Sequence, residues 1–197
     1  MSVIEFIILA VALSLEALIV MHSCARTTPV RLTKGLAESF IIALVNALLL
    51  LGGIRLGNLL RFTPDDLAES GTRQLLADTD NLVYLGLMIL VAVRLLFRSG
   101  KKGRQVQPYD ISRFATVLLL GIAVGVNTFI VGLALGFRIA LADSLWRAAV
   151  PMVVVMTLLA FLGVMLGRQQ KELRARRYTL VAVLFLLAFA LKGALWG

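Results

Sequence analysis

The chain has 197 residues, 60% of them hydrophobic, and a mean hydropathy of +0.94. This composition is typical of a membrane protein and excludes an ordinary soluble domain. The net charge of +9 would favour nucleic-acid binding in a soluble protein, but here the basic residues lie between apolar segments, so no nucleic-acid partner is expected. A single cysteine, Cys24, excludes an internal disulfide and a metal site built from several thiolates.

Six apolar segments follow one another along the chain, and each is close to the roughly 20 residues that cross a bilayer as a helix. The first contains Glu5 and Glu16 and lacks a positively charged start, so we expect it to be retained rather than cleaved as a secretion signal. The predicted spans cover residues 3–21, 36–57, 82–97, 114–136, 145–167 and 178–196. The predicted fold is an all-α polytopic membrane protein with six transmembrane helices in contact with lipid.

The basic residues are sorted among the connections. Fourteen of the 20 lie in or beside the first, third and fifth connections: Arg26, Arg31, Lys34, Arg94, Arg98, Lys101, Lys102, Arg104, Arg113, Arg168, Lys171, Arg174, Arg176 and Arg177. Connections rich in Lys and Arg stay on the cytoplasmic side. Both termini are therefore expected outside the cytoplasm. The expected location is the inner membrane of a bacterium.

The same arrangement occurs twice along the chain. Glu16 in the motif SLEALIV lies in the middle of the first predicted helix, and Asn127 in GVNTFIV lies in the middle of the fourth, 111 positions later. The second and fifth helices end in matching glycine pairs, Gly-Ile-Arg-Leu-Gly at 53–57 and Gly-Val-Met-Leu-Gly at 163–167. These matches predict an internal repeat of three helices.

The repeat divides one membrane domain into a first half at residues 1–104 and a second half at residues 105–197. Each half crosses the membrane an odd number of times, so the second enters from the opposite side and the halves form an inverted pair. Inverted repeats are typical of secondary transporters, whose substrate site lies near the midplane between the halves. The matching positions of Glu16 and Asn127 indicate that place.

Glu16 is interpreted as the only carboxylate deep within a predicted span. A charged side chain at the bilayer centre costs about 2.5 to 3.5 kcal/mol on insertion scales, so a buried acid needs a compensating role. The hypothesis is a cation ligand or a proton carrier. The alternative is a protonated carboxyl that hydrogen-bonds a neighbouring helix.

Asn127 and Asn46 provide neutral oxygens near Glu16. Amide and carboxylate oxygens suit hard cations such as manganese, magnesium or calcium, and Asn127 could complete such a site by facing Glu16 across the axis of the repeat. For both asparagines the alternative is an interhelical hydrogen bond that holds two helices together.

Three other features have mainly structural interpretations. Arg94 and Lys192, near the ends of the third and sixth helices, favour contact with the headgroups, with gating or coupling as the alternative. The glycine pairs favour close helix packing. His22 and Cys24 are interpreted as residues of interface packing or solvent contact, with an entry ligand pair for a soft metal as the alternative. The acidic connection at 63–80 is interpreted as a solvated loop with a short amphipathic turn, with a cation-attracting vestibule as the alternative.

The chain lacks a phosphate-binding glycine loop and a nucleophile elbow. We therefore expect no enzyme activity and no cofactor apart from a transported cation, and any active transport would use an ion gradient.

These residues resemble the MntP-type manganese efflux pumps, small six-helix proteins of the LysE-like exporter group. The resemblance rests on Ser-Leu-Glu-Ala at 14–17, Gly-Val-Asn-Thr at 125–128, Val-Asn at 45–46 ahead of a glycine pair, the segment 162–168 and Arg94. It implies the fold and manganese as the nominal substrate. The family's acids on helices one, two and four are here Glu16, Asn46 and Asn127, so this chain is a divergent member.

The sequence thus predicts a secondary transporter, a cation exporter with a midplane site. The predicted ion ligands are Glu16, Asn46, Asn127 and Thr128, and the predicted gating or coupling residues are Arg94 and Lys192. One alternative is transport of a monovalent ion or small organic solute on the same fold, because one acid holds a divalent ion weakly. Another is a non-transporting structural subunit. The oligomeric state stays open, with a homo-oligomer among the options.

Overall fold

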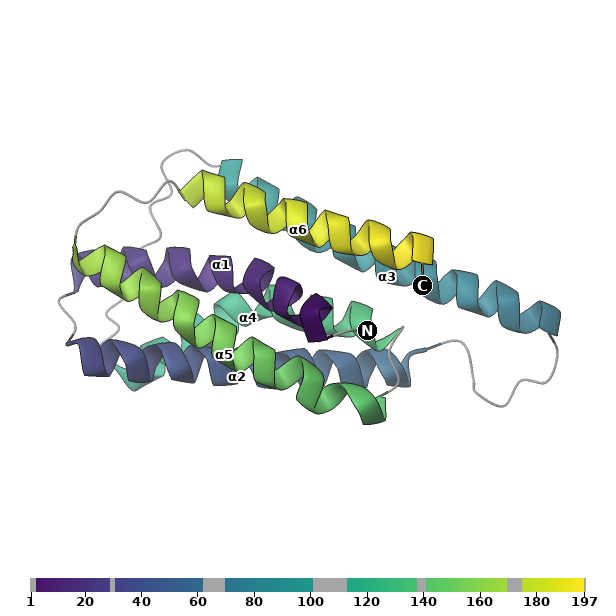
Figure 1. The fold of residues 1–197 in the computed structure, drawn as a ribbon, viewed down its shortest axis with the longest axis horizontal. Coiled ribbons are helices and arrows are strands. Elements are labelled where there is room, and N and C mark those ends of the chain that lie inside the picture. The colour runs from purple at the N-terminus through teal and green to yellow at the C-terminus, as the bar shows by residue number, and fades with distance from the viewer. Residues whose placement is uncertain are drawn as a thin grey trace.

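The computed structural model describes residues 3–28, 31–61, 70–100, 113–137, 141–169 and 175–196. This part of the chain contains helices and no strand. The helices are α1 (Val3–Thr27), α2 (Leu32–Leu59), α3 (Ser70–Gly100), α4 (Phe114–Gly136), α5 (Leu141–Arg168) and α6 (Ala175–Trp196). Figure 1 shows them as one elongated bundle, in which α1 begins and α6 ends at the same end. The all-helical prediction is confirmed.

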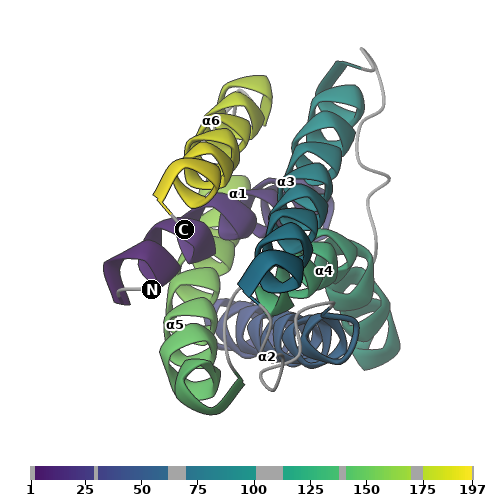
Figure 2. The same ribbon diagram turned by 90° about the vertical axis from the view of Figure 1, so that its right-hand side faces the viewer.

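The bundle has three layers of two helices when it is viewed along its length (Figure 2). One outer layer pairs α3 with α6, the middle layer holds α1 and α4, and the other outer layer pairs α2 with α5. The most extensive packing joins the middle layer to the α2/α5 layer, where α2 lies on α4 and α1 lies on α5. By contrast, α1 and α4 touch each other at few positions.

Five of the helices are long and apolar enough to cross a membrane: α1, α2, α3, α4 and α5. In the described part of α6, Arg176 and Arg177 lie at the start and Lys192 lies near the end, and α6 does not meet the same criterion. Large apolar side chains cover the outside of the bundle, including Leu48, Leu119 and Leu184, each more than 60% exposed. Such a surface suits lipid rather than water.

Closely spaced glycines explain how the middle layer packs so tightly. A methyl group added at Gly53 or Gly57 of α2 would overlap backbone atoms of α4. A methyl group added at Gly163 or Gly167 of α5 would overlap backbone atoms of α1. Small residues let two helix backbones approach within contact distance, and the predicted packing role of both glycine pairs is confirmed.

One helix differs from its prediction. The span of α3 was expected to begin at residue 82, with residues 63–80 as a solvated loop. The helix begins at Ser70, and Asp80 is only 4% exposed, with its carboxylate 3.8 Å from Nε of Arg61. The loop prediction is wrong for residues 70–80, because a polar helical extension is not apolar enough to be recognised from hydropathy. Residues 63–69 lie outside the described residues.

Candidate ion-binding site

The polar residues predicted at mid-depth of α1 and α4 are in direct contact. The amide nitrogen Nδ2 of Asn127 donates a hydrogen bond of 2.7 Å to the carboxylate oxygen Oε2 of Glu16. Asn127 is 2% exposed and Glu16 is half-buried. This bond is therefore a principal link between two helices that otherwise touch little.

A second polar pair lies one residue further along α4. The hydroxyl of Thr128 donates to Oδ1 of Asn46 on α2 at 2.9 Å, and both side chains are buried. The Nδ2 of Asn46 donates to the carbonyls of Ile42 at 2.9 Å and Gly121 at 3.2 Å. Consecutive residues of a helix point about 100° apart, so α4 reaches α1 through Asn127 and α2 through Thr128.

The two asparagines differ in how their oxygens are used. Oδ1 of Asn46 accepts from Thr128, whereas Oδ1 of Asn127 is buried and accepts no hydrogen bond within the described part of the chain. A buried amide oxygen without a donor costs about 1 to 3 kcal/mol. Such an atom is a candidate ligand for a cation, because a hard cation would satisfy it.

Other hydroxyls in the bundle are satisfied locally. Ser14 donates to the carbonyl of Ala10 and Ser39 to that of Gly35, each one turn back in its own helix. Thr157 donates to Val153 in the same way. This back-bonding uses each hydroxyl hydrogen within its own helix.

The two predicted gating residues lie in different surroundings. Arg94 is exposed on α3. Lys192 on α6 forms an ion pair with Glu5 on α1, with Nζ 2.5 Å from Oε1. Neither residue contacts the mid-depth cluster through an interaction seen among the described residues.

Besides Asp80, a second buried acid was missed by the sequence analysis. Glu38 of α2 is 4% exposed and lies near the start of its helix, not deep within the span as Glu16 does. The predicted span began at residue 36, whereas α2 begins at Leu32, which places Glu38 almost two turns inside the helix. Gly35, three residues earlier in the same helix, was the available signal of this burial. A methyl group added at Gly35 would meet Val164, so this part of α2 lies close to α5.

The expectation for His22 and Cys24 agrees with their burial, since they are 4% and 0% exposed. Within the described residues, no group of three His, Cys, Asp or Glu side chains is arranged to hold a metal ion. Any cation at the mid-depth cluster would therefore be held by one carboxylate together with neutral oxygens.

Apolar helices of membrane-spanning length around a buried carboxylate and two amides define an integral membrane protein with an internal polar site. The chain matches the family model described as "Putative manganese efflux pump" (MntP) over residues 66–193, about two thirds of its length. It belongs to this family, and the resemblance noted from the sequence is confirmed. No significant match is found among curated proteins or solved structures.

The family match assigns the chain to membrane transport of the manganese-efflux type. The matched region includes Arg94, Asn127, Thr128 and Lys192, whereas Glu16 and Asn46 precede it. Glu16 and Asn46 are connected to the matched region by their hydrogen bonds with Asn127 and Thr128.

Proposed function

We propose that this protein exports manganese across the inner membrane of a bacterium, by alternating access to a site between α1 and α4. The observation that carries the proposal is the contact between Glu16 and Asn127, in which a carboxylate meets a buried amide whose oxygen lacks a donor. An intramembrane ionisable residue beside a polar partner on another helix is the usual arrangement of an ion path.

Six crossings arranged as an inverted repeat of two halves, 1–104 and 105–197, are part of the proposal. Its support is that each helix pair has a counterpart: α2 on α4 corresponds to α1 on α5, and α1 with α6 corresponds to α4 with α3. The remaining contacts, α1 with α4, α2 with α5 and α3 with α6, each join an element to its own equivalent.

Individual residues support the same relation. A methyl at Gly53 would meet the carbonyl of Phe129 on α4, and a methyl at Gly163 would meet the carbonyl of Leu18 on α1. Phe129 lies 111 positions after Leu18, the offset that also separates Asn127 from Glu16. Gly57 and Gly167 repeat the pattern against Leu133 and His22, which are also 111 positions apart.

In this arrangement the Glu16 and Asn127 contact joins equivalent residues of the two halves and lies on their common axis. Rocking of the halves about that axis would expose the site to each side in turn. The sparse contact between α1 and α4 leaves little packing to break when they separate.

A cation at the site would take the place of the Asn127 amide hydrogen on Glu16. Half a turn of the amide would bring Oδ1 beside the carboxylate, so that both residues present oxygen to the ion. In the structure, the Nδ2 donor of Asn127 compensates the charge of Glu16.

Asn46 and Thr128 were predicted as ligands. We propose that their main role is to hold Asn127 in place. Their mutual hydrogen bond, with the bond from Asn46 to Gly121, fixes α4 against α2 and thereby sets the direction of Asn127. The second lone pair of Asn46 Oδ1 remains chemically able to accept an additional ligand.

A monovalent cation is the second candidate substrate. One carboxylate neutralises one positive charge, and affinity for a divalent ion rises with the number of charged ligands. The observation in its favour is that Asn127, the partner of Glu16 on α4, and Asn46, the partner of Thr128 on α2, are both neutral amides.

The deciding experiment is ion flux in proteoliposomes that contain wild type or Glu16→Gln. The expected result is manganese flux, followed with a manganese-quenched dye, that falls to the background of empty liposomes in the variant. Manganese flux that is unchanged in Glu16→Gln overturns the proposed site. Sodium flux without manganese flux selects the second candidate, and the absence of any ion flux favours a structural subunit or a different solute.

A further inference from the structure

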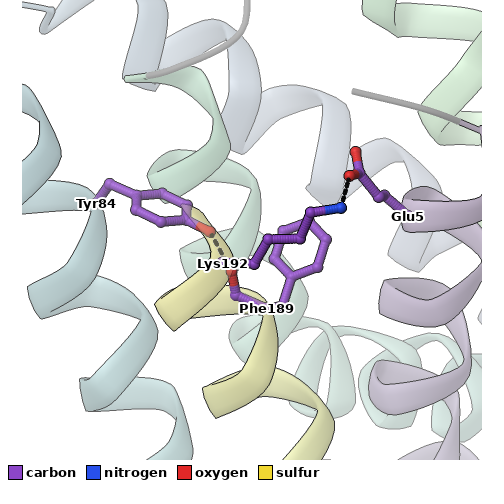
Figure 3. A network of polar contacts seen from close by, with 4 residues as sticks. All are labelled: Glu5, Tyr84, Phe189 and Lys192. Atoms are coloured by element: carbon purple, nitrogen blue, oxygen red, sulfur yellow. Dashed lines mark hydrogen bonds and ion pairs between the residues drawn. The ribbon is translucent and has the colours of Figure 1, made fainter. Parts of the chain in front are cut away.

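Glu5 and Lys192 connect the two ends of the chain. Glu5 lies in the first turn of α1 and its side chain is 19% exposed, whereas Lys192 lies near the end of α6 and its side chain is 55% exposed. Figure 3 shows the lysine reaching from α6 across to the carboxylate on α1. The ion pair therefore bridges the beginning of the first half and the end of the second.

A buried hydrogen bond fixes this part of α6 on its other side. The hydroxyl of Tyr84 on α3 donates to the carbonyl of Phe189 at 3.3 Å, and Tyr84 is 1% exposed (Figure 3). Phe189 lies one turn before Lys192. The end of α6 is thus held between α3 and α1, and only its link to α1 is an ion pair at a partly exposed position.

Glu5 lies on the same face of α1 as Glu16. The two acids are 11 residues apart, which is about three turns and roughly 16 Å along the helix. Leu9 and Ala12 lie between them on that face and are 2% and 1% exposed. The face is closed in the described state, and it would form a direct path from Glu16 to the end of the bundle if α6 moved away from α1.

The opposite end of the proposed repeat has different chemistry. The position equivalent to Lys192 is Arg94, and the position equivalent to Glu5, 111 residues later, is Thr116. Arginine and threonine form no ion pair, although α3 packs on α4 as α6 packs on α1. Among the described residues, an ionic closure of this kind is seen at the end where α1 begins.

We propose that Glu5 and Lys192 form the gate at the end of the bundle where α1 begins, and that Glu5 is a second carboxylate on the path of the exported cation. The inference rests on the proposed transport through Glu16. Lys192 neutralises Glu5 while the gate is closed. When α6 moves away, Glu5 receives the cation that leaves Glu16.

The first test measures access to the closed face. Cys24, which is buried, is replaced by alanine and a single cysteine is introduced as Leu9→Cys, which is labelled with a membrane-impermeant maleimide from the side that bears the termini. Lys192→Met is expected to raise the labelling rate roughly two- to fivefold, the range set by the free energy of a partly exposed ion pair. Lys192→Arg should keep the wild-type rate.

Arg94→Met is the matched control, because it removes the equivalent cation at the other end. It should leave labelling at position 9 unchanged. An equal increase in both methionine variants, or no increase in Lys192→Met, overturns the gate. Thermal unfolding of each variant in detergent checks that the bundle is intact.

The second test asks whether Glu5 binds the exported cation or only holds α6 against α1. The double variant Glu5→Lys with Lys192→Glu restores the ion pair but moves the acid from α1 to α6. Labelling at position 9 should return to the wild-type rate, while manganese flux stays at least about threefold below wild type. Full recovery of flux would show that only the pairing matters and would overturn the role of Glu5 on the path.

Failure of this inference can be told from failure of the proposed function. Glu16→Gln reports on the mid-depth site alone, so lost flux in that variant together with unchanged labelling in Lys192→Met rejects the gate and keeps the site. Unchanged flux in Glu16→Gln rejects both the site and the path that starts from it.

Discussion

Asn127 contacts Glu16 through its nitrogen and leaves its buried oxygen without a donor. We predict that Asn127→Asp binds manganese at least roughly tenfold more tightly than wild type, because a second carboxylate adds charge to a hard-cation site. Turnover should fall, since a more tightly held ion is released more slowly. Isothermal titration of the detergent-solubilised protein measures the affinity, and liposome flux measures the turnover.

Asn58→Asp is the control for that experiment. Asn58 lies on α2, and its one hydrogen bond within the described part of the chain is donated to the carbonyl of Ile54 in its own helix, at 3.0 Å. An added carboxylate there should leave manganese affinity unchanged. Equal affinities of wild type and Asn127→Asp would contradict the assignment of Asn127 as a ligand.

Asn46 should matter more for stability than for substrate contact. Asn46→Ala removes the acceptor of the buried Thr128 hydroxyl and the additional hydrogen bond that Asn46 donates to the carbonyl of Gly121. We predict a loss of about 1 to 3 kcal/mol in the free energy of unfolding, measured by thermal unfolding in detergent. Asn58→Ala, which loses one local bond, should cost less than about 1 kcal/mol. Similar losses in the two variants would argue against Asn46 as the link between α2 and α4.

The meeting of Glu16 and Asn127 could be predicted from the sequence, because their positions match in the proposed repeat and equivalent residues of an inverted pair can meet on its axis. The orientation of the Asn127 amide could not be predicted. Its nitrogen can donate directly to the acid, or its oxygen can face the acid across a shared cation. The burial of Glu38 was also missed, because a residue near a helix end is buried or exposed according to the neighbouring helix it faces.

At the scale of the helices, the glycines at which α2 meets α4 and α5 meets α1 allow a direct comparison. Gly53→Ala would place a methyl against the carbonyl of Phe129, and Gly163→Ala would do the same at Leu18. Because both contacts are with backbone, relief requires a helix to shift, and overpacking of this kind costs about 1 to 3 kcal/mol. We predict losses of similar size for the two variants.

Gly86→Ala is the matched control, since nothing lies within 4 Å of a methyl group at that position of α3. Alanine there should be neutral or should stabilise the helix by up to about 1 kcal/mol. Thermal unfolding of the three variants in one detergent measures the order. A loss confined to Gly53→Ala would contradict the proposed equivalence of the two glycine contacts.

The helix order was predictable because long apolar runs have no alternative structure in a bilayer. The bounds of α4 were predicted without error, since the helix is apolar from Phe114 to Gly136. The start of α3 was not, because its first turns are polar and the burial of Asp80 depends on Arg61 at the end of α2. Tertiary contacts of that kind leave no periodic signal in one helix.

At the scale of the whole molecule, the number of crossings decides on which side the chain ends. Five helices meet the length and composition of a membrane span, and α6 with Arg176, Arg177 and Lys192 does not. The ion pair between Glu5 and Lys192 nevertheless requires α6 to end where α1 begins, as Figure 1 shows. A helix of 22 residues is about 33 Å long, which is enough to cross the hydrocarbon core.

We therefore predict that both termini lie outside the cytoplasm, in agreement with the basic first, third and fifth connections. Alkaline phosphatase fused after the last residue should be active, and green fluorescent protein at the same place should be dark. Fusions that end in the third connection, rich in Lys and Arg, should give the reverse pattern. A fluorescent fusion at the C-terminus together with an external N-terminus would mean five crossings. That outcome would separate Lys192 from Glu5 by the thickness of the membrane and remove both the inverted pair and the gate.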